Sequence, residues 1–230
     1  NNSAEVTVKA EIGARITATA TPKTGYTFKR WRGAGISYPT NVNLSYVVGS
    51  NAEIKAEFKS PNIYVRGTNG NWYSNATNVP GGAAEGNDDT GTGSKQKPYA
   101  TVSKALSQCT ATGTAYTIFI DGTIEENTTL DIASGKKVTI ESLRKATIPA
   151  VIHDNRPNPT AEQCLVTTAG TLTLDGIALE GMITGLPGTP HAVSGQEAFG
   201  IKQTGGAVTA KGGNMAIKNF SHGVKIEGGT

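Results

Sequence analysis

Leu172-Thr173-Leu174-Asp175-Gly176-Ile177 is the stretch that decides the fold, because its pattern recurs along the second half of the chain. The pattern reads apolar, any, apolar, charged, small, apolar, and Val138–Leu143 and Met215–Phe220 repeat it. The three copies begin at residues 138, 172 and 215, which are 34 and 43 residues apart. Short strands that recur and end at small residues are typical of a chain wound into stacked coils. The repeats therefore predict a solenoid, a fold that usually binds partners or carries loops.

The composition also favours an all-β chain with many tight turns. Of 230 residues 29 are glycine, whereas glycine normally makes up roughly 7% of a protein. Hydrophobic residues are 37% of the chain, they tend to alternate with polar ones, and helical periodicity is almost absent. The length suits one large domain or two smaller ones.

Charge and targeting patterns exclude several classes of partner. The net charge is +3 and the densest basic run is Lys29–Arg32, whereas a nucleic-acid interface needs a basic stripe with spaced aromatics. We interpret this run as one strand whose solvated basic residues flank a buried Trp31. With no transmembrane or lipidation motif, we predict no nucleic-acid partner and no membrane insertion in this segment.

The two cysteines, Cys109 and Cys164, leave two interpretations open. They could form a disulfide in a secreted protein, or both could be small core residues. Neither has the spacing of a metal ligand, and we predict no metal and no cofactor.

Two segments with different rhythms meet near Lys59–Asn62, which predicts domains at 1–59 and 61–230. The chain begins and stops in what look like cut edges, so we expect a fragment of a longer protein. The first segment alternates apolar and polar residues in four expected strands, at 15–20, 26–31, 43–47 and 52–58.

Alternation within these strands predicts a thin core in the first segment. In the second strand it puts Tyr26, Phe28 and Arg30 on one face and Thr27, Lys29 and Trp31 on the other. The expected core therefore uses only one of the two aromatics Phe28 and Trp31. Its other members are Tyr26, Ile54 and Phe58.

This first segment resembles a known surface module. It contains a T-A-x-P-x-x-G-Y-x-F-x-x-W core at 19–31 and a terminal A-x-F strand at 56–58. On these residues it resembles an internalin-type B-repeat of the divergent class. The resemblance implies a small β-grasp-like module, used as a spacer or adhesive unit in bacterial surface proteins. The family's extra opening strand is at best a stub at Val6–Ala10, so the module is expected to be trimmed at its start.

The second segment opens with a short strand at Ile63–Val65, followed by a long polar stretch from 66 to 97. A helix is expected next, with Pro98 in its first turn and an apolar face. The residues of that face are Tyr99, Val102, Leu106 and Cys109. A buried strand at 116–120 then leads into the coils, whose expected strands are 130–132, 138–140, 165–166, 172–174, 208–210, 215–217 and 224–226.

The order of these elements resembles the capped start of another family. Five short motifs precede the first coil strand: Ile63–Val65, Gly86–Asp88, Gly91-Thr92, Lys97–Thr101 and Lys104–Leu106. On these motifs the segment resembles pectin-lyase-like right-handed parallel β-helix proteins. The resemblance implies a β-helix whose first coil is covered by the short α-helix. We expect the coils of the β-helix to continue beyond this segment.

The sequence does not lead us to predict a catalytic site, although one column of charged residues could form one. Aligning the repeats puts Glu141, Asp175 and Lys218 in one column, which on an outer face could act on acidic polysaccharides. A solvent-exposed charge ladder is the ordinary interpretation of such a column. The acids Asp88 and Asp89 read as turn formers, because their spacing does not match a calcium loop. His153, His191 and His222 occur in no metal or catalytic pattern.

Trp72 and Tyr73 are the candidate ligand-binding residues, because exposed aromatics in a polar loop can stack on sugar rings. The rival interpretation is that they fold back onto the coils. We expect a bacterial cell-surface or secreted protein that works in adhesion or display, without catalysis in this segment. The expected partner is a carbohydrate or a host or other extracellular protein. A polysaccharide lyase, a glycoside hydrolase or a carbohydrate-binding module is the alternative.

Overall fold

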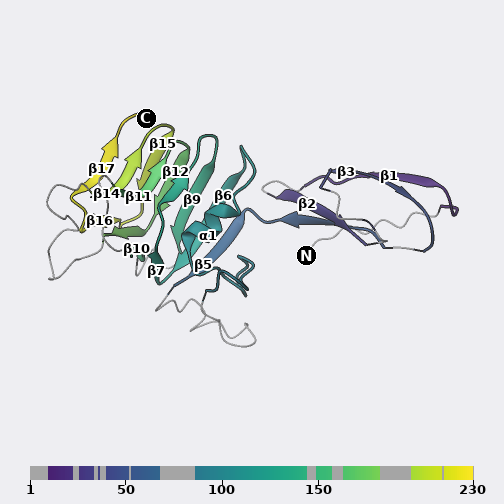
Figure 1. Ribbon diagram of the computed structural model, residues 1–230, viewed down its shortest axis with the longest axis horizontal. Helices are drawn as coiled ribbons and strands as arrows, with labels where there is room; N and C mark the ends of the chain where they lie inside the picture. Colours follow the sequence, from purple (N-terminus) through teal and green to yellow (C-terminus); the bar gives the residue numbers. More distant parts are fainter. Residues whose placement is uncertain are drawn as a thin grey trace. The chain divides into compact units, whose positions relative to one another are not determined.

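The chain forms two compact units, residues 1–60 and 61–230, in a computed structural model (Figure 1). The structure describes residues 10–22, 26–33, 36, 40–51, 53–67, 86–143, 149–156, 163–181, 198–213 and 215–229. Strands dominate both units, and the described residues contain a single short helix, so the all-β expectation is confirmed.

The second unit is a stack of coils with three parallel sheets, which is a parallel β-helix-like fold (Figure 1). Each described coil supplies one strand to each sheet, and Figure 1 shows the strands of successive coils side by side. The first sheet contains β5 (Asn62–Arg66), β6 (Ala115–Asp121), β9 (Lys137–Ser142), β12 (Thr171–Asp175) and β15 (Ala207–Lys211). The second contains β7 (Thr123–Glu126), β10 (Ala150–Asp154), β13 (Ile177–Glu180) and β16 (Ala216–Lys218). The third contains β8 (Leu130–Ile132), β11 (Gln163–Thr168), β14 (Ala198–Gln203) and β17 (His222–Ile226).

Like positions of successive coils lie directly over one another in this stack. Ile118, Ile140 and Leu174 pair in register across β6, β9 and β12, and all three are fully buried. Since side chains alternate across a strand, this column lines the core while the residues between face outward. The register therefore builds one continuous apolar core from coil to coil.

The third copy of the sequence pattern occupies a different sheet from the other two. Val138–Leu143 and Leu172–Ile177 fall on β9 and β12 of the first sheet, but Met215–Phe220 falls on β16 of the second. The pattern describes a short strand followed by a corner. In the copy on β12 the corner residue is Gly176 (φ 67°), and in the copy on β16 it is Asn219 (φ 63°). Both residues have the left-handed backbone conformation. Because different corners share this chemistry, aligning the copies gave the wrong sheet for the last one.

Helix α1 (Val102–Ser107) covers the first coil, where it packs against β5, β7 and β8. It begins after Thr101, whose hydroxyl accepts from the backbone N–H of Lys104 at 3.1 Å, a standard N-cap bond. The expected start at Pro98 was therefore too early, since Tyr99 bridges to β5 instead. All four residues of the expected apolar face are buried, but only Val102 and Leu106 lie on α1, because Tyr99 bridges to β5 and Cys109 follows the helix.

The first unit consists of two antiparallel pairs, β1 (Arg15–Thr19) with β3 (Asn43–Val47) and β2 (Thr27–Arg32) with β4 (Lys55–Lys59). The register between β2 and β4 shifts between Phe28 and Arg30. Such a bulge inserts one extra residue and resets the alternation of faces.

The bulge places both Phe28 and Trp31 in the small core, where their ring centroids lie 5.7 Å apart. The sequence had set them on opposite faces. Two other expected core residues are partly exposed, Tyr26 at 45% and Phe58 at 39%. Leu44 and Ala20 are buried beside Trp31 in their stead.

Both cysteines lie inside the protein, and neither is part of a disulfide. Cys109 directly follows α1 and is fully buried, and Cys164 lies near the start of β11 with 8% exposure. The interpretation as small buried residues therefore describes them, and the disulfide alternative does not.

Candidate functional site

A row of four titratable side chains crosses the second sheet on its outer face, with one residue from each coil. Glu125, His153, Glu180 and Lys218 are register neighbours on β7, β10, β13 and β16. Parallel strands lie about 4.8 Å apart, so adjacent members of the row are within reach of one another. We call these four residues the outer charge row.

Two polar contacts link the members of the outer charge row in pairs. His153 Nδ1 lies 2.7 Å from Glu125 Oε2, and Lys218 Nζ lies 3.2 Å from Glu180 Oε2. The amide of Asn219 donates to the other oxygen of Glu180 at 3.0 Å. The left-handed corner at Asn219 thus holds one carboxylate of the row in place.

A carboxylate beside an imidazole orients the ring and selects its tautomer. When Nδ1–H donates to Glu125, the opposite nitrogen of His153 carries a lone pair and can accept a proton. The side chains of His153 and Glu125 are 27% and 42% exposed, so solutes can reach this pair. The row can therefore bind polar ligands and can exchange protons with them.

The row was missed in the sequence, although a signal for it exists. Each member directly follows a buried or half-buried aliphatic residue that points into the core. Those aliphatic residues are Ile124, Ile152, Leu179 and Ile217. An aliphatic residue followed by a titratable one, once per coil, marks the outer face of this sheet.

The column expected from the repeats is corrected at its third member. Glu141 on β9 does pair in register with Asp175 on β12, but the next residue in that column is Lys211 and not Lys218. Lys211 Nζ lies 3.4 Å from Asp175 Oδ2, and the Asp175 side chain is buried, so this pair differs from the solvent-exposed charge ladder expected.

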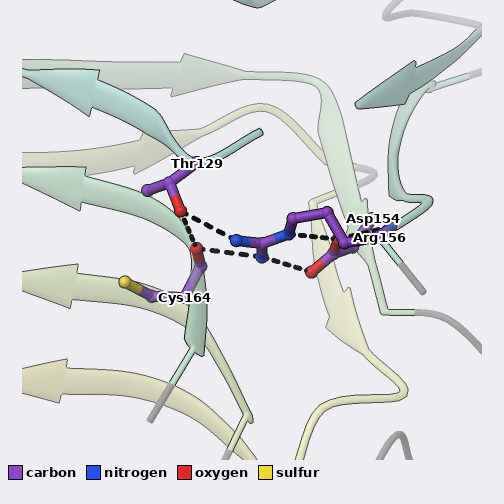
Figure 2. A network of polar contacts seen from close by, with 4 residues as sticks. All are labelled: Thr129, Asp154, Arg156 and Cys164. Atoms are coloured by element: carbon purple, nitrogen blue, oxygen red, sulfur yellow. Dashed lines mark hydrogen bonds and ion pairs between the residues drawn. The ribbon is translucent and has the colours of Figure 1, made fainter. Parts of the chain in front are cut away.

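Inside the corner after the second sheet, Arg156 connects two coils through a buried polar network (Figure 2). Its guanidinium donates to both oxygens of Asp154, at 2.7 and 2.5 Å, and to the hydroxyl of Thr129 at 2.8 Å. It also donates to the backbone carbonyl of Cys164 at 3.0 Å, which accepts from Thr129 as well. Figure 2 shows the guanidinium between Asp154 on one side and these two oxygens on the other. The network is structural, because its donors and acceptors satisfy one another.

A second buried carboxyl, Glu126, lies one strand away from Asp154 in register. It is fully buried, and its oxygen Oε1 accepts from the backbone N–H groups of Val102 and Ser103 at the start of α1. Burial raises the pKa of Glu126 from 4.5 to about 7, against the lowering effect of those hydrogen bonds.

The sequence predicted local turns for Asp88 and Asp89, but the side chain of Asp88 bonds to residues 12 and 13 positions away, and Asn87 forms the local turn. Asp88 Oδ1 accepts from the backbone N–H of Ala100 at 2.8 Å, and Asp88 Oδ2 accepts from the Thr101 hydroxyl at 2.6 Å. Asn87 accepts from the N–H of Asp89 at 2.9 Å. These contacts fasten the stretch to the start of α1.

The candidate ligand-binding residues Trp72 and Tyr73 lie outside the described residues, as does His191. The remaining histidine, His222 on β17, stacks on Phe199 with ring centroids 5.1 Å apart. In the described parts of the chain, no three His, Cys, Asp or Glu side chains come together as metal ligands. Nor does any described helix have the length and apolar character needed to cross a membrane.

Comparison with known protein families gives a match in the first unit. Residues 2–62 match the divergent InlB B-repeat domain family. The match contains the two antiparallel pairs and the core around Trp31. This family is typical of surface proteins. No curated protein and no solved structure gives a significant match to the chain.

Proposed function

We propose that this chain is part of a bacterial cell-surface or secreted protein that works in adhesion or display. The observation that carries the proposal is the B-repeat match at residues 2–62, directly followed in the chain by a stack of parallel coils. Stacked coils of this kind form extended binding surfaces in many repeat proteins. In this proposal the domains are a B-repeat-like module at 1–59 and the start of a β-helix at 61–230.

The coils are proposed to wind in the right-handed sense of pectin-lyase-like β-helix proteins. Crossover connections between parallel strands are right-handed in nearly all proteins, which supports this choice. Variable binding residues are proposed to lie in the chain segments that connect β10 to β11 and β13 to β14. The ligand is a carbohydrate or an extracellular protein.

Binding to a glycan array and to immobilised extracellular glycoproteins tests this function. The intact chain is expected to bind at least one of these probes saturably, and Trp72→Ala or Tyr73→Ala is expected to weaken binding at least tenfold. Tyr26→Ala is the matched control, because Tyr26 is an exposed aromatic in the first unit. Absence of saturable binding to every probe would contradict adhesion. Equal loss in all three variants would remove Trp72 and Tyr73 from the site.

A second candidate function is catalysis on an acidic polysaccharide, which the outer charge row favours. His153, oriented by Glu125, could accept a proton from a sugar ring carbon, with Lys218 near the sugar carboxylate. Release of unsaturated uronates from pectate or alginate would support this function over adhesion alone. His153→Gln should then abolish release, while Glu141→Ala, on the first sheet, should leave it unchanged.

A further inference from the structure

The last residue of β7, Glu126, occupies an unusual position for an acidic side chain. It is 0% exposed, and it faces the inside of the stack at the end covered by α1. Fully buried glutamates are rare unless they are paired with a cation. No cation pairs with Glu126 among the described residues, since the nearby Arg156 is bound to Asp154.

The two carboxyl oxygens of Glu126 have different surroundings. Oε1 accepts from the N–H groups of Val102 and Ser103, so it holds the first turn of α1. Oε2 is buried and has no hydrogen-bond partner. A buried oxygen without a partner costs about 1–3 kcal/mol, and more when it carries charge. The hydrogen bonds at Oε1 therefore compensate the negative charge of ionised Glu126 only in part, because Oε2 has no hydrogen-bond partner in the closed form.

Among the groups that face Glu126 from neighbouring elements, Asp88 adds to the cost of ionisation. Asp88 approaches from the stretch before α1, and its charge also raises the pKa of Glu126. Asp154, the register partner on β10, is a second carboxylate, but Arg156 neutralises it. The helix itself presents the Ser103 hydroxyl, whereas Glu125 and His153 lie on the opposite face of the sheet.

We propose that Glu126 is a proton-dependent latch that fastens α1 over the first coil. In the protonated form Oε1 still accepts from Val102 and Ser103, and the carboxyl carries no charge. Loss of the proton favours an open form in which α1 lifts and water reaches the carboxylate. Opening would expose the apolar end of the stack around Leu130, Val102 and Leu106. The cap would thus respond to pH while the coils beneath it stay folded.

The raised pKa of Glu126 determines how the stability of the closed cap depends on pH. The folded pKa lies above the ordinary value of 4.5, so the cap is closed most firmly below pH 4.5 and loosens as the pH rises through about 7. One pKa unit corresponds to a tenfold change in the equilibrium constant. Between pH 5 and pH 7 the equilibrium constant for closing should fall by a factor of about 40.

Hydrogen exchange of the intact chain tests the latch. The probes are the amides of Ala105 and Cys109, which donate to Thr101 and Leu106 within the cap. After correction for intrinsic exchange, their protection should fall about 40-fold from pH 5 to pH 7. Amides of β12, in the middle of the stack, should keep their protection.

Two variants separate the latch from general pH effects. Glu126→Gln should abolish the pH dependence of cap protection, whereas Glu125→Gln, which changes the adjacent outward-facing residue, should retain it. The proposal would be overturned if amide protection of the cap did not change with pH in the natural chain. The same pH dependence in Glu126→Gln as in the natural chain would also overturn it. If Glu126→Gln does not fold, the carboxyl carbon of Glu126 is titrated by NMR in the natural chain. A midpoint near 7 supports the latch, and a midpoint near the ordinary 4.5 overturns it.

Discussion

Asp154 and Arg156, two residues apart at the end of β10, form a bidentate ion pair inside the protein. Arg156 Nε and Nη2 lie 2.7 and 2.5 Å from the two oxygens of Asp154, and the two side chains are 7% and 12% exposed. The same guanidinium reaches Thr129 in the preceding coil. One side chain thus neutralises a buried carboxylate and connects two coils.

Loss of Arg156 should destabilise the second unit strongly. Arg156→Met leaves Asp154 buried without its cation, which typically costs about 3–5 kcal/mol. Chemical denaturation followed by circular dichroism measures the change. The double variant Asp154→Asn with Arg156→Met should recover most of the loss, since no unpaired charge remains. A double variant as unstable as the single one would show that the charge is not the cause.

Truncation of the central core column should be costly. Leu174→Ala removes a fully buried side chain that stacks between Ile140 and Ala210, so we expect a loss of about 2–5 kcal/mol in unfolding free energy. Ile226→Ala is the matched control, because Ile226 is 68% exposed on the last described strand. The control should stay within about 0.5 kcal/mol of the natural chain. Equal effects at the two sites would contradict the stacking of like positions.

Gly206 should not tolerate a side chain. It is left-handed, with φ 61°, and an added Cβ would lie 1.9 Å from the carbonyl oxygen of Gly170 in the preceding coil. Gly206→Ala should therefore lose about 2 kcal/mol or more, from strain and from separation of the coils. Gly213→Ala provides the comparison, because its Cβ would meet open space. Thermal denaturation of both variants measures the difference, and a stable Gly206→Ala chain would contradict the close approach.

The thiol of Cys109 should be unreactive in the folded protein. Burial raises the pKa of Cys109 to about 11, so at pH 8 only about one thiol in a thousand is ionised. In a Cys164→Ala background, alkylation by iodoacetamide at pH 8 should be slow and should accelerate sharply in denaturant. Labelling of the folded chain at the rate of a free thiol would show that the cap does not cover this residue.

Several elements of the fold follow from local sequence patterns. Strict alternation of apolar and polar residues predicted that Ile140 and Leu174 point inward, and both are fully buried. The apolar spacing also predicted the buried face of α1, because Val102 and Leu106 are one helical turn apart. Such patterns are enough to predict which side chains are buried wherever a strand or helix has one face against the core and one face toward solvent.

Other features depended on pairing that the local pattern does not encode. The bulge between Phe28 and Arg30 brings Trp31 to the same core as Phe28, against simple alternation. Similarly, Lys218 left its expected column because corners of different sheets share the same left-handed chemistry at Gly176 and Asn219. In the first case an extra residue in β2 changes which side chains become neighbours. In the second case the change comes from a corner conformation that occurs after strands of two different sheets.

The sequence by itself determined that the second half of this protein is a stack of short strands, because apolar alternation and small corner residues are local properties. Only the tertiary structure decided that His153 meets Glu125 and that Glu126 holds the start of α1. These partners are 28 and 23 residues apart along the chain. The connections between coils differ in length, so the register that joins such residues is set by packing of the whole stack.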